Sequence, residues 1–283
     1  MMKSSAAASN ADQAVVDGFG DEWSRFDQSE LPDDERQQIF EDYFGIFPWN
    51  DLGPDAVGFD LGCGSGRWAR VVAPRVGTLH CIDASDAALN VAKRMLANIP
   101  NVRFHHASVD QIPLQDGQAD FGYSLGVLHH VPDTRDGLRQ CVGKLKAGAP
   151  FLIYLYYRFD NKPLWFRALW RSSDVFRRTI SRLPHPVRYA ASQLIALSIY
   201  WPLARGARVA ERMSLPTTNL PLTYYRDKSF YTMRTDALDR FGTRLEQRFT
   251  REEIRRMMEE AGLERISFSD RMPFWCAVGY KRD

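Results

Sequence analysis

Between residues 57 and 157 the sequence alternates short apolar runs with amphipathic runs, and this alternation limits the possible folds more than any other feature. The runs expected to be strands are Val57–Leu61, Thr78–Asp83, Val102–His106, Phe121–Leu125 and Phe151–Tyr157. The runs expected to be helices are Gly66–Ala73, Ser85–Asn98 and Thr134–Lys146. Strands that alternate with helices in this way predict an α/β fold with a parallel, doubly wound sheet.

The alternation stops at residue 158 and resumes at Thr250, where Thr250 and Glu253 form a capping-box pattern that predicts the start of a helix. Two further strands are expected at Leu263–Phe268 and Trp275–Tyr280. We therefore divide the 283 residues into a flexible tail (1–17), a helical lid segment (18–50), a core (51–157), a helical cap (158–240) and the closing part of the core (241–283).

The segment at 18–50 is rich in aromatic residues, and Ile39, Phe40, Tyr43 and Phe44 recur at helical spacing. This spacing is typical of an amphipathic helix packed on the next domain, which is the interpretation we favour. The same residues also fit a lid that closes over a pocket.

A glycine-rich turn follows the first expected strand, in the sequence Asp60-Leu61-Gly62-Cys63-Gly64-Ser65-Gly66. Alternate glycines let the backbone turn tightly and approach a ligand closely, and the helix that follows offers free N–H groups and positive potential. Such turns also bind dinucleotides. However, Asp60 would repel a pyrophosphate, whereas it suits a cationic ammonium group, so a nicotinamide-dependent oxidoreductase is disfavoured.

Asp83 ends the second expected strand, 21 residues after Gly62. In a doubly wound sheet this position lies beside the crevice at the carboxyl ends of the strands. A carboxylate at that place can accept hydrogen bonds from both hydroxyls of a ribose. We favour this role over a helix-capping or surface aspartate.

Residues 57–157 resemble the class I S-adenosylmethionine-dependent methyltransferases, in the group of the quinone C-methylases and many small-molecule methyltransferases. The motifs that carry the resemblance are Asp60–Gly66, Asp83, Ile112–Asp116 before Ala119–Phe121, Gly126–Val131 and the Leu-Lys-Ala-Gly run at 145–148. The resemblance implies a Rossmann-like, seven-stranded sheet with a helical cap insertion. It also implies methyl transfer from S-adenosylmethionine, which leaves S-adenosylhomocysteine.

The resemblance implies roles for individual residues at the strand ends. Asp60 and the backbone of Gly62, Cys63 and Gly64 would hold the methionine part of the cofactor, and Asp83 would hold the ribose.

The adenine and sulfonium contacts follow from the same resemblance. Ala84 would lie against the adenine. Ser108 and Val109 stand where the family usually has an aspartate that contacts the adenine amino group, so this contact is either weaker here or made by Asp110. The residues that would flank the sulfonium are Leu125 and Gly126.

His129 and His130 follow the fourth expected strand, next to the place where a methyl acceptor must lie. An imidazole titrates near neutrality and can take a proton from a hydroxyl or an amine. Either histidine could instead pack against or cap the following helix. Of the two, we favour His129 as the catalytic residue, although positioning alone can suffice for an electrophile as reactive as a sulfonium.

The insertion carries an unexpected charge. Residues 158–212 contain eleven basic and three acidic residues, a net charge of +8, so that the rest of this +2 chain carries −6. Arginines bind carboxylates and phosphates, and with aromatic neighbours they suit a planar or saccharide-like acceptor that carries acidic groups. The alternative is a cap whose arginines face water. The candidate substrate-binding residues are Trp23, Tyr156, Tyr157, Arg158 and Tyr225.

We expect a small-molecule acceptor, either a natural product or a saccharide-like metabolite, that is methylated on oxygen or nitrogen. A second hypothesis is a methyltransferase at a membrane surface with a lipid-linked or quinone-like acceptor, because the apolar residues from Leu194 to Leu203 are flanked by arginines and fit an interfacial helix. A third is a protein that binds S-adenosylmethionine without catalysis.

Other partners are not expected. We find no nucleic-acid-binding module and no cluster of His, Asp or Glu with the spacing of metal ligands. The four cysteines are widely scattered and the N-terminus does not resemble a secretory signal, which predicts a reducing, cytoplasmic setting. The oligomeric state is left open.

Overall fold

A seven-stranded sheet with the strand order β3-β2-β1-β4-β5-β7-β6 forms the centre of the computed structural model, which describes residues 9–283. The strands are β1 (Val57–Leu61), β2 (Thr78–Asp83), β3 (Val102–His106), β4 (Phe121–Leu125), β5 (Pro150–Tyr154), β6 (Leu263–Phe268) and β7 (Cys276–Lys281). Strands β1 to β5 pair in parallel, whereas β7 is antiparallel to both β5 and β6. The predicted Rossmann-like α/β sheet is confirmed.

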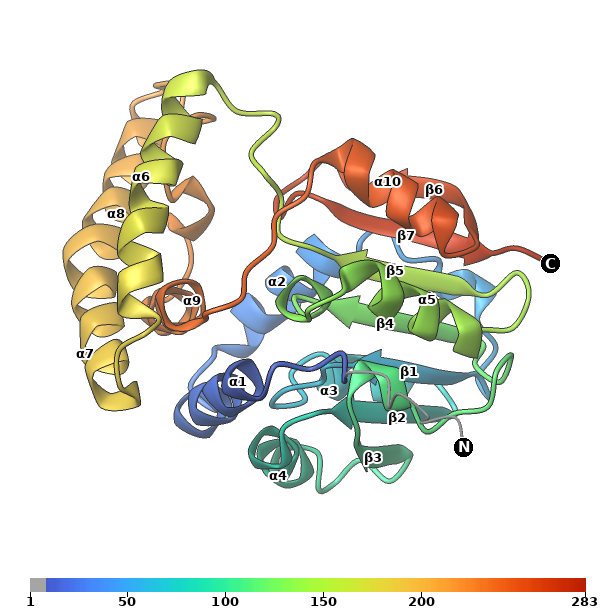
Figure 1. Ribbon diagram of the computed structural model, residues 1–283. Helices are drawn as coiled ribbons and strands as arrows, with labels where there is room; N and C mark the ends of the chain where they lie inside the picture. The colour runs from blue at the N-terminus through green and yellow to red at the C-terminus, as the bar shows by residue number, and fades with distance from the viewer. Residues whose placement is uncertain (1–8) are drawn as a thin grey trace, which may run out of the picture.

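Helices flank the sheet and also form a separate layer beside it (Figure 1). Those that accompany the sheet are α1 (Gln13–Arg25), α2 (Asp33–Phe44), α3 (Ala69–Val72), α4 (Asp86–Met95), α5 (Thr134–Lys144) and α10 (Arg251–Glu260). The layer beside it consists of α6 (Leu164–Ile180), α7 (His185–Ile195), the π-helical η5 (Ala196–Tyr200), α8 (Trp201–Arg212) and α9 (Phe230–Gly242). The remaining short helices are η1 (Trp49–Asp51), η2 (Ala73–Arg75), η3 (Val109–Gln111), η4 (Leu128–His130) and η6 (Thr223–Tyr225). Within the described chain, no helix has both the length and the apolar character needed to cross a bilayer.

The N-terminal boundary differs from the prediction. Residues 13–17, which we expected in a flexible tail, lie in α1. Asp12 caps this helix, since its side chain accepts hydrogen bonds from the N–H groups of Ala14 and Val15. The part of the tail at residues 1–8 lies outside the described residues.

Two further boundaries differ near the carboxyl ends of the strands. The helix expected at Gly66–Ala73 is regular only over α3, because the turn before it keeps a positive φ of 79° as far as Gly66. β5 ends at Tyr154 rather than at Tyr157, because Tyr157 leaves the sheet and forms a bridge with Phe249. The aromatic residues after Tyr154 are thereby free to line a cavity.

The centre of the sheet depends on two glycine–phenylalanine pairs between β1 and β4. Gly58 lies opposite Phe121, and Phe59 lies opposite Gly122. A Cβ atom on Gly58 would lie 2.1 Å from the ring of Phe121, and one on Gly122 would lie 2.3 Å from the ring of Phe59. Each glycine therefore makes room for the phenylalanine of the neighbouring strand.

We predict that Gly58→Ala lowers the free energy of unfolding by about 1–3 kcal/mol, because the added methyl group overpacks a fully buried ring. Chemical denaturation of the purified protein measures the change. Gly206→Ala is the matched control, since a Cβ atom at that position in α8 meets no atom within 4 Å. The control should be neutral or slightly stabilising. Equal effects of the two substitutions would contradict the packing argument.

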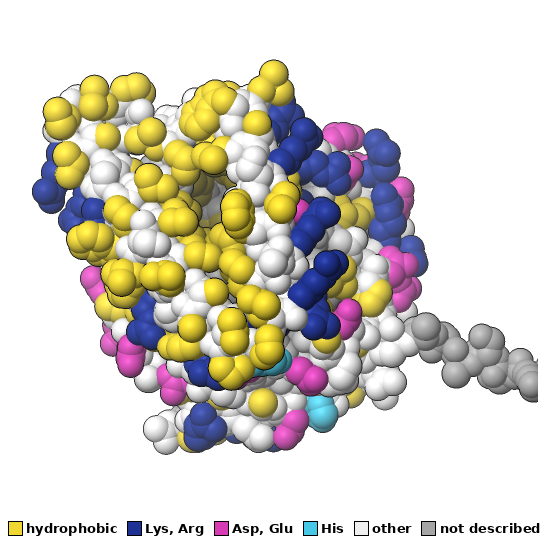
Figure 2. All heavy atoms as spheres, turned by 60° about the vertical axis from the view of Figure 1, so that its left-hand side comes forward, with side chains coloured by type: hydrophobic (Ala, Val, Ile, Leu, Met, Phe, Trp, Pro, Cys, Tyr) yellow, Lys and Arg dark blue, Asp and Glu magenta, His cyan; other side chains and the backbone are white. Residues whose placement is uncertain are grey.

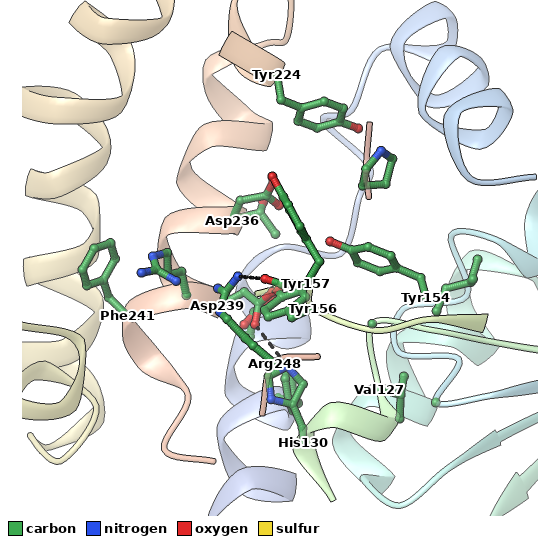
Figure 3. A pocket seen from close by; sticks show the side chains of 18 of the residues that line it. Val127, His130, Tyr154, Tyr156, Tyr157, Tyr224, Asp236, Asp239, Phe241 and Arg248 are labelled. Carbon is green, nitrogen blue, oxygen red and sulfur yellow. Dashed lines mark hydrogen bonds and ion pairs between the residues drawn. The ribbon is translucent and has the colours of Figure 1, made fainter. Parts of the chain in front are cut away.

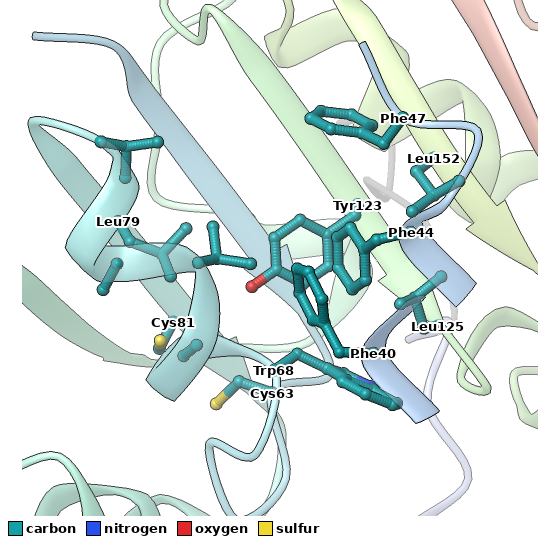
Figure 4. Close-up of a cluster of buried hydrophobic side chains, with 14 of the residues drawn as sticks. Phe40, Phe44, Phe47, Cys63, Trp68, Leu79, Cys81, Tyr123, Leu125 and Leu152 are labelled. Carbon is teal, nitrogen blue, oxygen red and sulfur yellow. The ribbon is translucent and has the colours of Figure 1, made fainter. Parts of the chain in front are cut away.

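α2 belongs to the core rather than to a movable lid. Phe40 and Phe44 are 2% and 1% exposed, and the Phe44 ring lies edge-on to Tyr123 of β4 with their centroids 5.1 Å apart (Figure 4). Phe40 and Phe44 stack on each other at 4.4 Å. These contacts agree with the favoured interpretation of this segment as a helix packed on the next domain.

α9 is the central helix of the separate layer, and it packs against α6, α7 and η5 as well as against α1. Two buried arginines of the insertion hold its C-terminal end: Arg177 donates to the Thr243 carbonyl at 2.9 Å and Arg188 donates to the Gly242 carbonyl at 2.8 Å. Part of the positive charge of the insertion therefore stabilises the layer itself.

Candidate functional site

The glycine-rich turn joins the ends of β1 and β2. The N–H groups of Gly62 and Cys63 both donate to the Ile82 carbonyl, at 2.8 and 3.1 Å. Gly62 and Gly64 have positive φ values of 78° and 54°. A Cβ atom on Gly62 would lie 2.3 Å from Val127, and one on Gly64 would lie 2.8 Å from the Trp23 ring. Only glycine fits these two positions.

Asp60 lies beneath this turn with only 1% of its surface exposed. Its Oδ2 atom has no hydrogen-bond partner among the described residues. Burial raises the pKa of Asp60 to about 8, although the nearby Tyr123 hydroxyl opposes the shift. Since buried polar atoms are almost always paired, this carboxyl group indicates a missing partner that donates hydrogen bonds.

Asp83 holds the neighbouring backbone in place. Its Oδ2 atom accepts from the N–H group of Gly64 and its Oδ1 atom accepts from that of Ser85, both at 2.8 Å. A carboxylate accepts more than one hydrogen bond on each oxygen, so Asp83 can still receive ligand hydroxyls. Burial raises its pKa, and the two backbone hydrogen bonds oppose this effect.

A cavity of about 670 Å³ extends from this turn to the helical layer. The predicted cofactor residues that line it are Gly62, Cys63, Asp83, Ala84, Ser108, Val109, Leu125 and Gly126. The predicted substrate residues that line it are Trp23, Tyr156, Tyr157 and Tyr225. Asp60 and Gly64 do not line it, although Leu61 and Cys63, which are next to them in the chain, do. The Ser108 hydroxyl donates to Asp110 at 2.5 Å.

The structure places Arg158, a predicted substrate residue, outside the lining of the cavity. It is exposed, pairs with Glu253 at 3.1 Å and donates to the Arg248 carbonyl at 2.9 Å. The chain turns away from the sheet after Tyr157, and this turn carries the Arg158 side chain toward α10. Of the basic residues at 158–212, only Lys162 lines the cavity, so the arginines of this segment do not support the expectation of an acidic acceptor.

The structure also reverses the preference between the two histidines. His129 is fully buried and does not line the cavity; its ring stacks on Tyr156 with the centroids 3.9 Å apart. His130 does line the cavity. Its Nδ1 atom is 2.6 Å from the Leu245 carbonyl and its Nε2 atom is 3.8 Å from Oδ1 of Asp239 (Figure 3). Burial lowers the pKa of His130 to about 4, so its imidazole is neutral at physiological pH.

Known proteins resemble the chain over the same region. A family model described as a methyltransferase domain matches residues 59–153. Residues 59–153 form a methyltransferase domain of the S-adenosylmethionine-dependent type.

The relatives differ in how much of this methyltransferase they cover. An uncharacterized methyltransferase of Mycobacterium tuberculosis is 26% identical over 51% of this chain and 74% of its own length. A ubiquinone biosynthesis O-methyltransferase of Aromatoleum aromaticum is 30% identical over 35% of this chain and 45% of its own length. A chain from the complex of the Haloferax volcanii Trm112 activator with a methyltransferase shares the fold, with a TM-score of 0.55 and 14% identity over 95% of this chain and 98% of its own.

The residues of this methyltransferase fit S-adenosylmethionine in two respects. Asp60 offers a buried carboxyl oxygen without a partner, which matches the ammonium group of the methionine part. Gly126 has a positive φ of 79° and nothing lies within 4 Å of the position of its missing Cβ, so the backbone there faces open space at the end of β4. We assign the cofactor contacts of these residues as a proposal.

We predict that Asp83→Ala weakens the binding of S-adenosylhomocysteine about tenfold or more, because hydrogen bonds to a charged group are lost. Titration calorimetry measures the dissociation constant. Asp86→Ala is the matched control, since Asp86 is exposed in the first turn of α4, three residues further on. An unchanged dissociation constant for Asp83→Ala would remove this residue from the ribose site.

Sequence reasoning missed a group of acids around the inner part of the cavity. Asp236 and Asp239 lie on α9 and Glu22 lies on α1, and all three line the cavity. Burial raises the pKa of Asp236 and of Asp239 to about 6, and it raises that of Glu22 well above its usual range with help from both aspartates. The one available signal was the spacing of Asp236 and Asp239, which places them on the same face of a helix.

Proposed function

We propose that this methyltransferase transfers the methyl group to an oxygen or nitrogen atom of a small molecule bound beneath the helical layer. One observation carries the proposal. Oδ1 of Asp239 and Nε2 of His130 lie 3.8 Å apart beside the cavity, and neither has a hydrogen-bond donor among the described residues. An O–H or N–H group of a bound acceptor would supply the donor that both atoms lack.

Asp239 is the better proton acceptor of the two. Its pKa of about 6 places it close to neutrality, where a general base is most effective. The Tyr156 hydroxyl donates to Oδ2 of Asp239, which leaves Oδ1 for the acceptor. The Leu245 carbonyl keeps the proton of His130 on Nδ1, so that Nε2 can position the same group from the other side.

S-adenosylmethionine supplies a methyl group on a sulfonium when it is bound. The chain's own residues would do the rest: Asp60 would hold the methionine part of the cofactor, Asp83 would hold its ribose, and Asp239 would take the proton of the acceptor. α1 and α9 cover part of the cavity, because Glu22 and Trp23 of α1 line it together with Asp239 of α9.

The lining of the cavity favours a natural product with an aromatic or aliphatic part over a saccharide. Its lining includes Tyr157, Phe159, Phe166 and Trp170. The buried cation Arg248 is already engaged, since it donates to Glu246 at 2.7 Å. Burial costs such a group much less when it is paired, so Arg248 itself offers little to an acidic acceptor.

Label transfer tests the proposal. The protein is incubated with S-adenosylmethionine labelled in its methyl group and with a small-molecule extract of the source cells. We expect label in a product of low molecular mass, and its methyl ether or N-methyl group can be identified by mass spectrometry. If the protein binds S-adenosylhomocysteine but transfers no label from any fraction, the alternative of a binding protein without catalysis replaces this proposal.

A further inference from the structure

The outward side of α6, α7, η5 and α8, together with the loop at 213–220, forms an apolar surface that we call the α6–α8 face. All fifteen large hydrophobic side chains that the described chain exposes lie between Leu164 and Leu220. Phe176 and Leu194 are 67% and 65% exposed. Figure 2 shows these side chains as a broad yellow area with basic side chains along its borders. An apolar area of this extent marks an interaction surface.

The cavity of the methyltransferase opens on the α6–α8 face. Its lining includes Leu169 and Phe176 of α6, Ile199 of η5 and Leu203 of α8, which are all about half exposed or more. The same lining includes Asp239 at the inner end. Figure 2 shows a hollow among the yellow side chains. An acceptor that enters here passes over hydrocarbon side chains before it reaches the polar groups.

The charge of the α6–α8 face favours an anionic bilayer as its partner. Arg171, Arg182 and Arg212 are exposed and form no ion pair with any described residue. Residues 158–212 carry a net charge of +8. A second copy of the chain would bring the same charge face to face in a two-fold dimer. A bilayer with anionic headgroups instead accepts both the arginines and the apolar centre.

We propose that the α6–α8 face docks on an anionic membrane and that the methyl acceptor is an amphiphile that resides in the bilayer. Its hydrocarbon part lies between α6 and α8 in the mouth of the cavity, and its O–H or N–H group reaches Asp239 and His130. This inference rests on the proposed function, because it names the substrate class of the same site.

Vesicle sedimentation tests the docking. The vesicles consist of phosphatidylcholine alone or of phosphatidylcholine with about 30% phosphatidylglycerol. Each is tested at about 20 mM salt, where electrostatic attraction has a long range, and at about 500 mM salt, where its range is short. We expect binding to the anionic vesicles at low salt. The triple variant Leu194→Gln, Leu197→Gln, Trp201→Gln should bind about tenfold more weakly, because these three exposed side chains lie outside the cavity lining.

Charge variants separate the basic residues of the α6–α8 face from those elsewhere. Arg171→Gln with Arg182→Gln should weaken vesicle binding about tenfold or more. Lys93→Gln with Arg94→Gln removes the same charge from exposed positions of α4 and should leave vesicle binding unchanged. Every variant should bind S-adenosylhomocysteine like the parent, which shows that it is folded.

The outcomes distinguish this inference from the function on which it rests. Label transfer to the lipid extract of the source cells, lost when vesicle binding is lost, supports both. Label transfer to an aqueous metabolite with no binding to anionic vesicles overturns the inference and leaves the proposed function intact. A dimer that the triple variant dissociates, without vesicle binding, identifies a second copy as the partner and also overturns it. No label in either extract removes the proposed function itself.

Discussion

Asp239→Asn is expected to lower kcat by about 10²–10⁴-fold, the range that a lost general base produces. The substitution keeps the shape of the side chain but removes the proton acceptor that faces His130 across 3.8 Å. Binding of S-adenosylhomocysteine should change little, because Asp239 lies in the helical layer rather than at the glycine-rich turn. The measurement is methyl transfer to the acceptor that the labelling experiment identifies.

The pH profile adds a readout that a merely structural aspartate would not affect. With a pKa of about 6, Asp239 is ionised above pH 6 and protonated below it. At saturating S-adenosylmethionine, kcat/KM for the acceptor should therefore fall about tenfold per pH unit below this value and level off above it. The low pKa of His130 keeps that imidazole neutral over the same range, so that it adds no second step.

Tyr156→Phe is the matched control for this assignment. The Tyr156 hydroxyl lowers the pKa of Asp239 by donating a hydrogen bond to it. Its removal should move the acid limb of the profile to higher pH while most of the activity above that limb is kept. A parent profile that is flat between about pH 5 and 8, or an Asp239→Asn variant with normal kcat, would show that positioning alone drives the transfer.

The half of the site that we propose for the cofactor could be located from the sequence because its residues are adjacent in the chain to strand ends. The order of apolar runs fixes where β1, β2 and β4 end, and parallel strands end at a common edge of the sheet. Gly62, Asp83, Ser108 and Gly126 therefore had to lie near one another, and all four line one cavity.

The half of the site that faces the acceptor could not be predicted in the same way. Asp239 reaches His130 only because α9 packs against α1 and is held at its C-terminal end by Arg177 and Arg188. These are contacts between elements far apart in the chain, and no motif encodes them. The choice between His129 and His130 depends in turn on the 2.6 Å hydrogen bond between His130 and the Leu245 carbonyl. The sequence around the two adjacent histidines does not reveal this bond.

The arginines of the insertion illustrate a further limit. Composition alone shows eleven basic residues at 158–212 and suggests one common role. The structure divides them into buried residues that hold α9, such as Arg177, and exposed residues without ion pairs among the described side chains, such as Arg171 and Arg182. Only burial separates the two groups, and burial depends on how the helices pack.

The second large effect concerns Asp60: we expect the affinity for S-adenosylhomocysteine to rise about 30-fold between about pH 5.5 and 7. The pKa of Asp60 is about 8 in the free protein, so the carboxyl group is largely protonated over this range. A cationic ammonium ligand binds the ionised form, and the association constant therefore rises about tenfold per pH unit below the pKa. The ligand's own amino group stays protonated here, since an α-amino pKa is about 7.7–8.0.

Calorimetry in paired buffers of different ionisation enthalpy provides the measurement, because binding at about pH 6.5 should release close to one proton per ligand. Asp60→Asn should bind more weakly at pH 7 and lose both the slope and the proton release. Asp83→Asn is the matched control, because it removes the other, half-buried carboxylate at the turn. This variant should bind S-adenosylhomocysteine more weakly but keep the slope. A slope that survives in Asp60→Asn would assign the titration to another group and would separate Asp60 from the ammonium site.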